Sequence, residues 1–293
     1  MVRVNPEQLS IIDPEAQELR YGAPGTKRDK DARFVRQTAS PTSAFATRDH
    51  DLHRSRRVPL NNFFSTQAIT SFEPFIQSKV EKVVQKLKCS QGTVLEAMDI
   101  YGALTTDVIS HYTYGESFGF LDDDKQDFRN EYLRDISGFM KAAPYMMHYP
   151  MLKYIMMAVP DRILACLSDG MASMIQIVDT SKSYARKTLA SQSNVKKQKT
   201  IDLEPRTIFQ TLLDPDFPAR ERSFERLTDE GVVIMVAGLE TTARFLTNIT
   251  CRLLSNPEVL EKLKAELNSA MPTPGARLRW KALENLPYLV STL

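Results

Sequence analysis

Apolar residues recur at helical spacing along most of the chain, and proline or glycine closes several of the segments. Helices are predicted at residues 72–92, 97–115, 124–143, 160–191, 206–215, 227–257 and 257–271, with a further one starting at Pro14. The first dozen residues instead alternate and are rich in valine and isoleucine, which predicts one or two short strands. The pattern indicates a mainly α protein, with residues 1–13 as a small β element and residues 14–293 as the helical portion.

One helix carries an unusual interruption at residues 232–245, which read VVIMVAGLETTARF. Thr228 is expected to cap this helix, and Asp229 and Glu230 suit the positive end of its dipole. The apolar run covers every helical face and predicts burial all round. In such an interior a glycine costs roughly 1 kcal/mol relative to alanine, and an unpaired carboxylate takes up a proton or destabilises the fold.

Two explanations of the interruption stay open on the residues alone. Local stability would select neither the glycine nor the acid, so the pattern indicates small residues, an acid and a hydroxyl that face a ligand. A glycine packing notch, with threonines bonded back to carbonyls one turn earlier and a glutamate facing solvent, would give the same letters.

Composition excludes some classes of function. Hydrophobic residues make up 42% and charged residues 25%, as in ordinary globular proteins, and the net charge of +2 gives no reason to expect a nucleic-acid partner. Cys89, Cys166 and Cys251 are few and widely spaced, which favours a reducing compartment and free buried thiols. The first residues contain no long apolar run, so neither a signal peptide nor a membrane anchor is expected in this chain.

Residues 237–242 read AGLETT and resemble the (A/G)Gx(D/E)TT motif on the long central helix of cytochrome P-450, the haem-thiolate monooxygenase family. By this resemblance, Ala237 and Gly238 let the helix pass flat over the haem. Glu240 would supply protons and Thr241 would relay them during oxygen activation. Such chemistry needs a pocket dry enough to protect the oxidant.

A second segment, residues 49–65, resembles the HxxRR and Phe-Ser segment of fungal members of this family. The resemblance places His53 and Arg57 on a haem propionate, where a planar guanidinium matches a carboxylate and a histidine N–H adds a second donor. Two other interpretations stay open, namely a metal site that includes His50 and His53, and a solvated basic helix face.

Further segments, among them TDVISHYTYGESFG and LENLPYLVSTL, are similar to the family in the same order over nearly the whole chain. The resemblance implies one partial cytochrome P-450 domain over residues 1–293 that contains the long oxygen-activating helix. After LPYL the family carries a Glu-x-x-Arg pair and a Phe-x-x-Gly loop with the iron-ligating cysteine, and this sequence has neither. We therefore expect a chain truncated at both ends, without the C-terminal haem-ligand region or the axial thiolate.

The resemblance implies a haem-dependent oxidoreductase that inserts one oxygen atom into an apolar small molecule, with a reductase as electron donor, in fungal secondary metabolism. Because the axial cysteine is missing, the chain as given is expected to be inactive. The alternatives are a non-catalytic remnant of the same ancestry and an unrelated helical interaction protein. No metal site other than the haem is expected.

Residues 145–160 read YMMHYPMLKYIMMAVP and are too often interrupted by polar residues and proline to span a bilayer. The resemblance places them in the substrate-access region, where they would touch a membrane surface peripherally. Core packing of their methionines is the alternative. A cytosol-facing location at the endoplasmic reticulum surface is expected.

A prediction about stability follows from residues 232–236, which in the family pack against elements that come after residue 293. A buried side chain contributes roughly 1.5–3 kcal/mol. For these five side chains together, losing half of the burial costs about 5 kcal/mol. This loss approaches the whole stability of a typical domain, about 5–15 kcal/mol. The chain made alone is therefore expected to be molten or to aggregate. Thermal unfolding followed by circular dichroism tests this, and a sharp cooperative transition of a soluble monomer would contradict it.

Overall fold

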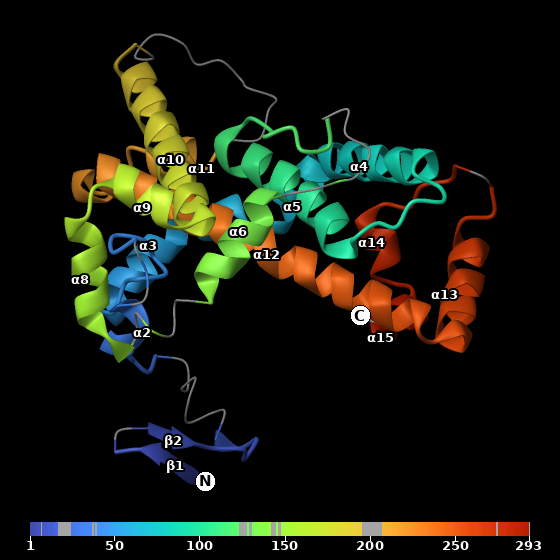
Figure 1. Cartoon of the computed structure of the whole chain (residues 1–293), viewed down its shortest axis with the longest axis horizontal. Helices are drawn as coiled ribbons and strands as arrows, with labels where there is room; N and C mark the ends of the chain where they lie inside the picture. The colour runs from blue at the N-terminus through green and yellow to red at the C-terminus, as the bar shows by residue number, and fades with distance from the viewer. Residues whose placement is uncertain are drawn as a thin grey trace.

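Helices dominate the computed structural model of the chain, and a two-stranded sheet lies at its N-terminus (Figure 1). The structure describes residues 1–293 except 7, 17–24, 37, 39, 123–127, 129–130, 142–144, 146–147, 195–206, 274 and 293. The strands are β1 (Val2–Asn5) and β2 (Gln8–Ser10). The helices are α2 (Ala32–Arg36), α3 (His50–Phe63), α4 (Thr66–Cys89), α5 (Ala97–Tyr114), α6 (Glu131–Met140), α8 (Pro150–Ala158), α9 (Asp161–Leu167), α10 (Asp169–Asn194), α11 (Ile208–Leu212), the 3-10 helix η1 (Ala219–Arg222), α12 (Phe224–Leu254), α13 (Pro257–Ala270), α14 (Trp280–Leu283) and α15 (Pro287–Thr292).

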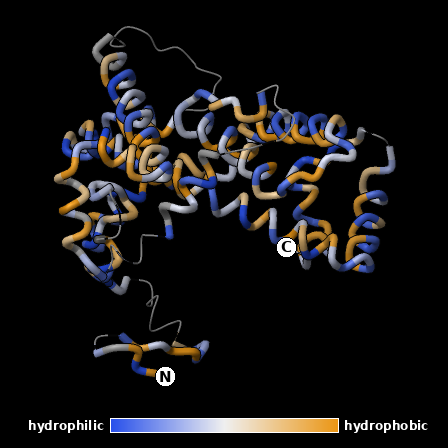
Figure 2. The backbone as a smooth tube through the Cα atoms, in the orientation of Figure 1, coloured by the Kyte–Doolittle hydropathy of each residue, from blue (hydrophilic) through white to orange (hydrophobic). Residues whose placement is uncertain are grey.

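The alternation predicts one or two short strands, and the structure has two in this segment, which pair as an antiparallel hairpin. Val2 lies opposite Ser10, and Arg3 lies opposite Leu9. The hairpin stands apart from the helices, and its hydrophobic segments remain exposed (Figures 1 and 2). A two-stranded sheet on its own is marginally stable in water. Most of the helix predicted after Pro14 lies outside the described residues.

Helices α5 and α13 begin and end within one residue of the prediction, whereas α4 begins at Thr66, six residues before its predicted start. The Asp49 carboxylate accepts a hydrogen bond from the Leu52 N–H and caps α3, and the Ser65 hydroxyl caps α4 in the same way. Thr207 and Gln210 form a capping box at the start of α11. Gly115 ends α5 with φ of 80°, a conformation that favours glycine.

Helix α12 is the centre of the fold and packs against α5 on one side and α10 on another (Figure 1). The fully buried side chains around it include Leu133, Ile136, Ile177, Phe209, Leu227, Met235 and Leu239. By length and composition α12 could also cross a membrane, properties that the central helices of helical domains share. Its position among other helices explains its apolar composition.

The helix predicted over residues 160–191 is in fact two helices, α9 and α10. Ser168 separates them with an extended backbone, φ −163° and ψ 135°. Its carbonyl accepts hydrogen bonds from the N–H groups of Met171 and Ala172, so Ser168 starts α10 as it ends α9. The prediction missed that Ser-Asp is a helix-start signal within an otherwise helical pattern.

The predicted start of α12 is also wrong, because the helix begins at Phe224, one turn before the expected cap at Thr228. The hydroxyl of Ser223 caps it by accepting from the Arg226 N–H at 3.2 Å. Thr228 lies inside the helix and is buried. The helix dipole acts most strongly within the first turn, and Asp229 lies beyond that turn.

Burial of α12 on every face is not observed. Val232, Ile234 and Met235 are buried within the chain itself, so the expectation that this run depends on elements after residue 293 is wrong for them. Val233 is half-buried and Ala237 is exposed, because the face that they share borders a cavity. Whether the isolated chain is molten stays a prediction, which now rests on this open face.

The expectation of buried thiols is also wrong, since Cys89, Cys166 and Cys251 are all exposed. Cys89 is the last residue of α4, and Cys166 lies in the last turn of α9. Cys251 lies near the end of α12, where the neighbouring Arg252 is exposed as well. Each thiol lies near the end of a helix on a side that no described element covers.

Gly231 allows α10 and α11 to approach α12. A Cβ at this position would come within 2.4 Å of the Ser181 Oγ and 2.9 Å of the buried Phe209 ring. We expect Gly231→Ala to lower the free energy of unfolding by about 1–3 kcal/mol because the ring has no room to move. Gly138→Ala is the matched control, since a Cβ there meets nothing within 4 Å. Urea denaturation measures both, and equal effects of the two substitutions would contradict the prediction.

Candidate functional site

A cavity of about 440 Å³ lies between α12, α3, α5 and a turn formed by residues 40–47, which we call the 40–47 turn. Its apolar wall includes Phe45 from the turn, Leu60 from α3, Ile109 from α5 and Val233 from α12. Aromatic and aliphatic side chains with a few polar groups are typical of sites for small molecules and cofactors. The fold thus joins segments that lie far apart in the sequence.

Four of the predicted site residues line this cavity, namely His53, Arg57, Ala237 and Gly238. His53 and Arg57 are four residues apart on α3, so both side chains lie on one face of that helix. Val233 and Ala237 have the same spacing on α12. The two helices present these faces to a common space.

Positive charge gathers on the α3 side of the cavity. The pKa of His53 lies below its ordinary value of 6.5, first because the ring is partly buried and then because Lys30, Arg57 and His50 are positively charged neighbours. Within the described residues, neither the His53 ring nor the Arg57 guanidinium has a hydrogen-bond or ion-pair partner. A guanidinium and an imidazole without partners at the edge of an apolar cavity suit a carboxylate ligand.

The acid on the cavity lining, Glu230, is engaged elsewhere. Its carboxylate pairs with Arg226 one turn earlier on α12 and accepts a hydrogen bond from the Ala44 N–H at 2.9 Å. Glu230 therefore does not pair with Arg57 or His53.

Glu240 and Thr241 lie on the next turn of α12 and do not line the cavity. The Thr241 hydroxyl donates a hydrogen bond to the Ala237 carbonyl at 2.8 Å, which places it directly beside the cavity wall. The Glu240 carboxylate pairs with Arg244, and its side chain is 17% exposed against 57% for the arginine. The proton-transfer roles of Glu240 and Thr241 stay predictions.

Ala237 and Gly238 have different neighbours. A Cβ at Gly238 would come within 2.6 Å of the Ile109 side chain, so the glycine lets α5 approach α12. Ala237 borders the cavity and is exposed to it. The packing notch is therefore present at Gly238, and Ala237 borders a cavity, whereas a ligand in that cavity stays a prediction.

Comparison with known proteins identifies the family. The sequence profile described as Cytochrome P450 matches residues 8–293. The chain belongs to the cytochrome P450 family. The family match and the cytochrome P450 structures that the chain resembles imply haem as the cofactor.

Curated relatives come from fungi. Conidiogenone synthase PchP450 of Penicillium rubens is 37% identical over 291 residues, which cover 99% of this chain and 56% of the relative. Cytochrome P450 monooxygenase claJ of Penicillium crustosum is 33% identical, with 100% of this chain and 66% of the relative covered. Cytochrome P450 monooxygenase TRI4 of Fusarium sporotrichioides is 34% identical, with 99% and 54% covered. The chain therefore spans a little over half to two thirds of the length of these relatives.

Solved structures support the partial cytochrome P450 fold. A crystal structure of the cytochrome P450 CYP102L1 has a TM-score of 0.65 and 14% identity and covers 92% of this chain and 56% of that chain. The haem domain of cytochrome P450DA has a TM-score of 0.65 and 18% identity and covers 95% and 56%. At these identities the likeness concerns the fold alone.

The cavity residues of this cytochrome P450 chain fit a haem. The guanidinium of Arg57 and the imidazole of His53 are donors without partners in the described structure, as a propionate requires. Phe64 and Val233 offer apolar contacts to a flat macrocycle. The side chain of Ala237 is only a methyl group, which leaves room for such a ligand close to the α12 backbone.

The metal-site interpretation of α3 has little support. Asp49 caps the helix, and Asp51 pairs with Lys27 at 2.5 Å. No group of three or more histidine, cysteine, aspartate or glutamate residues in the described part of the chain is placed to hold a metal ion. The carboxylates next to His50 and His53 thus have structural partners.

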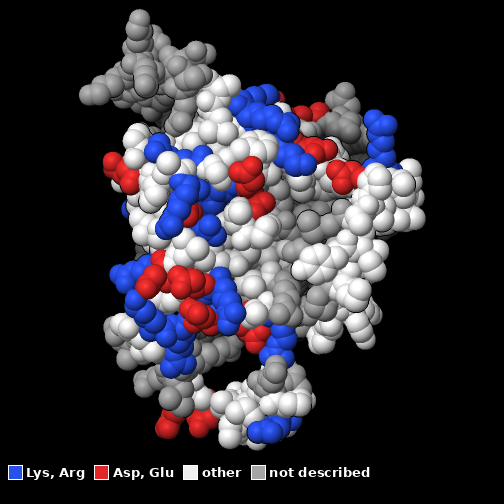
Figure 3. All heavy atoms as spheres, turned by 90° about the vertical axis from the view of Figure 1, so that its left-hand side faces the viewer, with Lys and Arg blue, Asp and Glu red and all other residues white. Residues whose placement is uncertain are grey.

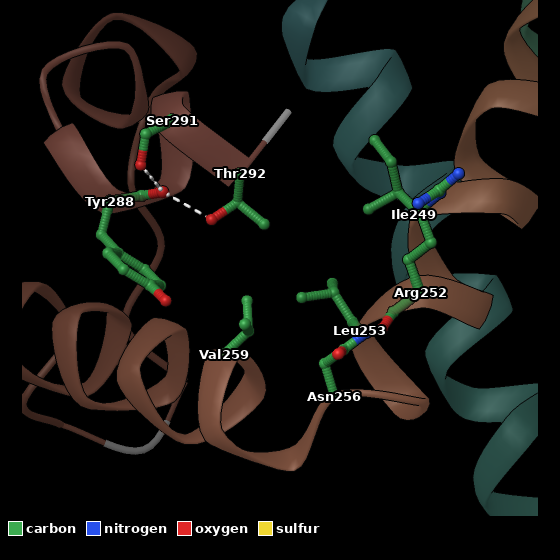
Figure 4. A pocket seen from close by; sticks show the side chains of 8 residues that line it. All are labelled: Ile249, Arg252, Leu253, Asn256, Val259, Tyr288, Ser291 and Thr292. Carbon is green, nitrogen blue, oxygen red and sulfur yellow. Dashed lines mark hydrogen bonds between the residues drawn. The ribbon is translucent and has the colours of Figure 1, made fainter.

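A second cavity of about 440 Å³ lies where α12, α13 and α15 meet (Figure 4). The Ser291 and Thr292 hydroxyls beside it both donate to the Tyr288 carbonyl, at 2.9 and 2.7 Å, and Arg252 lies on the opposite side (Figure 4). None of the predicted site residues lines it. The first cavity is therefore the candidate functional site.

Lys30 and Phe45 line the cavity but are not predicted from the sequence, and Glu230 has partners other than the helix dipole. Lys30 and Phe45 lie in a polar segment without periodicity, so no pattern indicates which of its residues border a cavity. Glu230 was assigned to the helix dipole, whereas its partners are Arg226 and the backbone of the 40–47 turn.

The lowered pKa of His53 predicts a pH dependence of stability. As pH falls below 6.5, the unfolded chain binds a proton at this histidine before the folded chain does, so the free energy of unfolding falls until the pH reaches the folded pKa. We expect His53→Gln to remove the contribution of this histidine to the fall in the free energy of unfolding between about pH 7.5 and about pH 5.5. Urea denaturation at both pH values measures it, with the exposed His148→Gln as control. An unchanged pH dependence in His53→Gln would contradict the prediction.

Proposed function

We propose that this chain forms the oxygen-activating part of a haem-dependent monooxygenase that oxidises an apolar small molecule in fungal secondary metabolism. The observation that carries the proposal is the convergence of His53, Arg57 and Ala237 on one apolar cavity. These residues come from two helices that are far apart in the sequence. The fungal relatives, a conidiogenone synthase among them, support the assignment to secondary metabolism.

The residues on α3 bind and orient the cofactor. Arg57 and the N–H of His53 donate hydrogen bonds to a propionate, which replaces the partner that both side chains lack in the described structure. When bound, haem supplies the oxygen-activating and electron-accepting chemistry. A carboxylate in this position also favours the protonated form of His53, opposite to the effect of Lys30 and Arg57.

Thr241 and Glu240 on α12 are the proton-transfer groups. The Thr241 hydroxyl donates to the Ala237 carbonyl and keeps lone pairs that accept a hydrogen bond from water at the cavity edge. The Glu240 carboxylate, held by Arg244, is the nearby group that can exchange a proton with such water. The apolar wall around Ile109 and Val233 limits the entry of further water.

A reductase serves as electron donor, and the region of α8 and α9 contacts a membrane surface peripherally. The exposed side chains of this region, each more than half exposed, are Tyr149, Met151, Tyr154 and Leu167. The alternative that Met151 packs in the core is therefore wrong. The side of the molecule that carries these helices shows a broad uncharged area beside clusters of both signs (Figure 3). Exposed tyrosines among aliphatic side chains suit the interface of a membrane facing the cytosol, for which the endoplasmic reticulum is the expected site.

Haem titration followed by the Soret absorbance tests the cofactor site. We expect Arg57→Met to weaken haem binding about 10-fold or more, because a charge-assisted pair with a propionate is lost. Haem dimethyl ester, in which both propionates are blocked, should bind wild type and Arg57→Met equally.

The matched control is Arg54→Met, which removes an exposed arginine from the same helix without touching the cavity. Equal haem affinity of wild type and Arg57→Met would contradict the binding site. A wild-type chain that binds neither haem nor its ester would favour the non-catalytic remnant.

A further inference from the structure

The two halves of α3 are held in different ways. The buried side chains of this helix all lie in its second half, and they are Pro59, Leu60 and Phe63. The first half, residues 50–57, contains one apolar side chain, that of Leu52, which is only half-buried. Core packing therefore fixes the end of α3 but not the half that carries His53 and Arg57.

Arg56 attaches this first half to the rest of the fold through polar contacts. Its Nε donates a hydrogen bond to the Glu221 carboxylate at 2.9 Å, and its Nη1 donates to the Thr47 hydroxyl at 2.8 Å. The Arg56 side chain is 14% exposed, and that of Glu221 is 10% exposed. A planar guanidinium bound at two atoms and largely withdrawn from water holds its helix in one orientation.

The other polar contacts of this half that the structure describes are open to water. Asp51 pairs with Lys27, but the two side chains are 61% and 67% exposed. The His50 N–H donates to the exposed Asp29 carboxylate at 3.0 Å. Exposed pairs contribute little, because water screens both charges and ordering two long side chains costs entropy. Arg56 thus makes the better shielded of the two ion pairs described for this half.

Glu221 joins the attachment to the start of α12. Its carboxylate lies 3.4 Å from the Arg226 Nε, and Arg226 pairs in turn with Glu230. Charges of alternating sign therefore connect α3, η1 and α12 in the order Arg56, Glu221, Arg226 and Glu230. These ion pairs link the two helices that line the candidate haem cavity.

The attachment sets the direction of the cavity-lining donors. Arg56 and Arg57 are adjacent, so their side chains leave the helix about 100° apart around its axis. His53 and Arg57 are four residues apart and share the face that lines the cavity. Once Arg56 is held on Glu221, the rotation of this half is fixed, and His53 and Arg57 keep their direction.

We propose that Arg56 and Glu221 are positioning residues that hold the first half of α3 so that His53 and Arg57 direct their donors at a carboxylate of the cofactor. Neither Arg56 nor Glu221 is among the described residues that line the cavity. Their part in cofactor binding rests on the proposed function, whereas the hold on α3 is a property of the chain without cofactor.

Hydrogen exchange with mass spectrometry on the full chain without haem tests the hold on α3. Arg56→Met removes the guanidinium and keeps an apolar stem, and Glu221 retains Arg226 as a partner. We expect amide exchange in residues 53–57 to become about 10-fold faster, with exchange in α4 unchanged. The matched control, Arg54→Met, removes an exposed arginine from the same half and should leave exchange as in the wild type. Unchanged exchange in residues 53–57 of Arg56→Met would overturn the proposal.

Titrations with haem and with haem dimethyl ester separate positioning from a merely structural role. Arg56→Met should bind haem about fivefold more weakly than the wild type, because the donors on α3 no longer keep their direction. It should bind the ester, whose propionates are blocked, as the wild type does. Equal weakening for haem and ester would show general damage to the cavity and refute the proposal, as would a haem affinity equal to that of the wild type.

The double variant with Arg57→Met tests whether Arg56 acts through its neighbour. Arg56→Met should reduce haem affinity less in the Arg57→Met background than in the wild type, since one of the donors that it positions is already gone. An equal reduction in both backgrounds would show that Arg56 acts independently of Arg57, contrary to the proposal.

Glu221→Gln provides a second variant in case Arg56→Met loses its fold, since it keeps the shape of the side chain and removes its charge. It should accelerate exchange in residues 53–57 and weaken the binding of haem but not of the ester. Loss of the folded state in both variants, followed by circular dichroism, would show that the pair supports the whole fold and not α3 alone, which contradicts the proposal. Failure of the wild type to bind haem refutes the proposed function alone, because hydrogen exchange measures the hold on α3 without haem.

Discussion

The structure depends on a division of α12 into two faces. Val232, Met235 and Leu239 turn one face into the core, where α5 and α10 bury it. Val233 and Ala237 turn the other face toward a cavity that α3 closes from the far side. Because the buried face fixes the rotation of the helix about its axis, it also fixes which residues reach the cavity. Core packing and the candidate site are thus consequences of one helical register.

Polar groups with hydrogen-bond partners and polar groups without them lie on different sides of this cavity. The donors that have no partner in the described structure, the Arg57 guanidinium and the His53 imidazole, lie on α3 at the edge of the cavity. The ionised groups inside, Glu230 and Lys30, are occupied with the 40–47 turn. An anionic ligand group therefore meets open donors on one side only, while the rest of the wall offers apolar contact. This asymmetry would give a planar ligand with carboxylates a defined orientation.

The sequence predicted the elements well where local chemistry decides them. Gly115 ends α5 and Pro257 begins α13 as predicted, because a left-handed glycine and a proline in the first turn act within a few residues. Four site residues, predicted by resemblance to two separate family segments, line one cavity. Lys30 and Phe45 could not be predicted, because their positions depend on α12 contacts far along the chain. The exposed cysteines were misjudged because composition does not report which side of a helix lacks a neighbour.

Gly238 shows why two explanations of one motif need not exclude each other. A family motif is usually explained by the ligand alone, yet here the glycine serves the approach of Ile109, whose side chain also lines the cavity. The residue that admits α5 thereby brings a wall of the cavity into place. Thr241 combines two functions in the same way, since the hydrogen bond to the Ala237 carbonyl holds its hydroxyl at the cavity edge. Local features that cost helix stability in this segment thus coincide with contacts that shape the cavity.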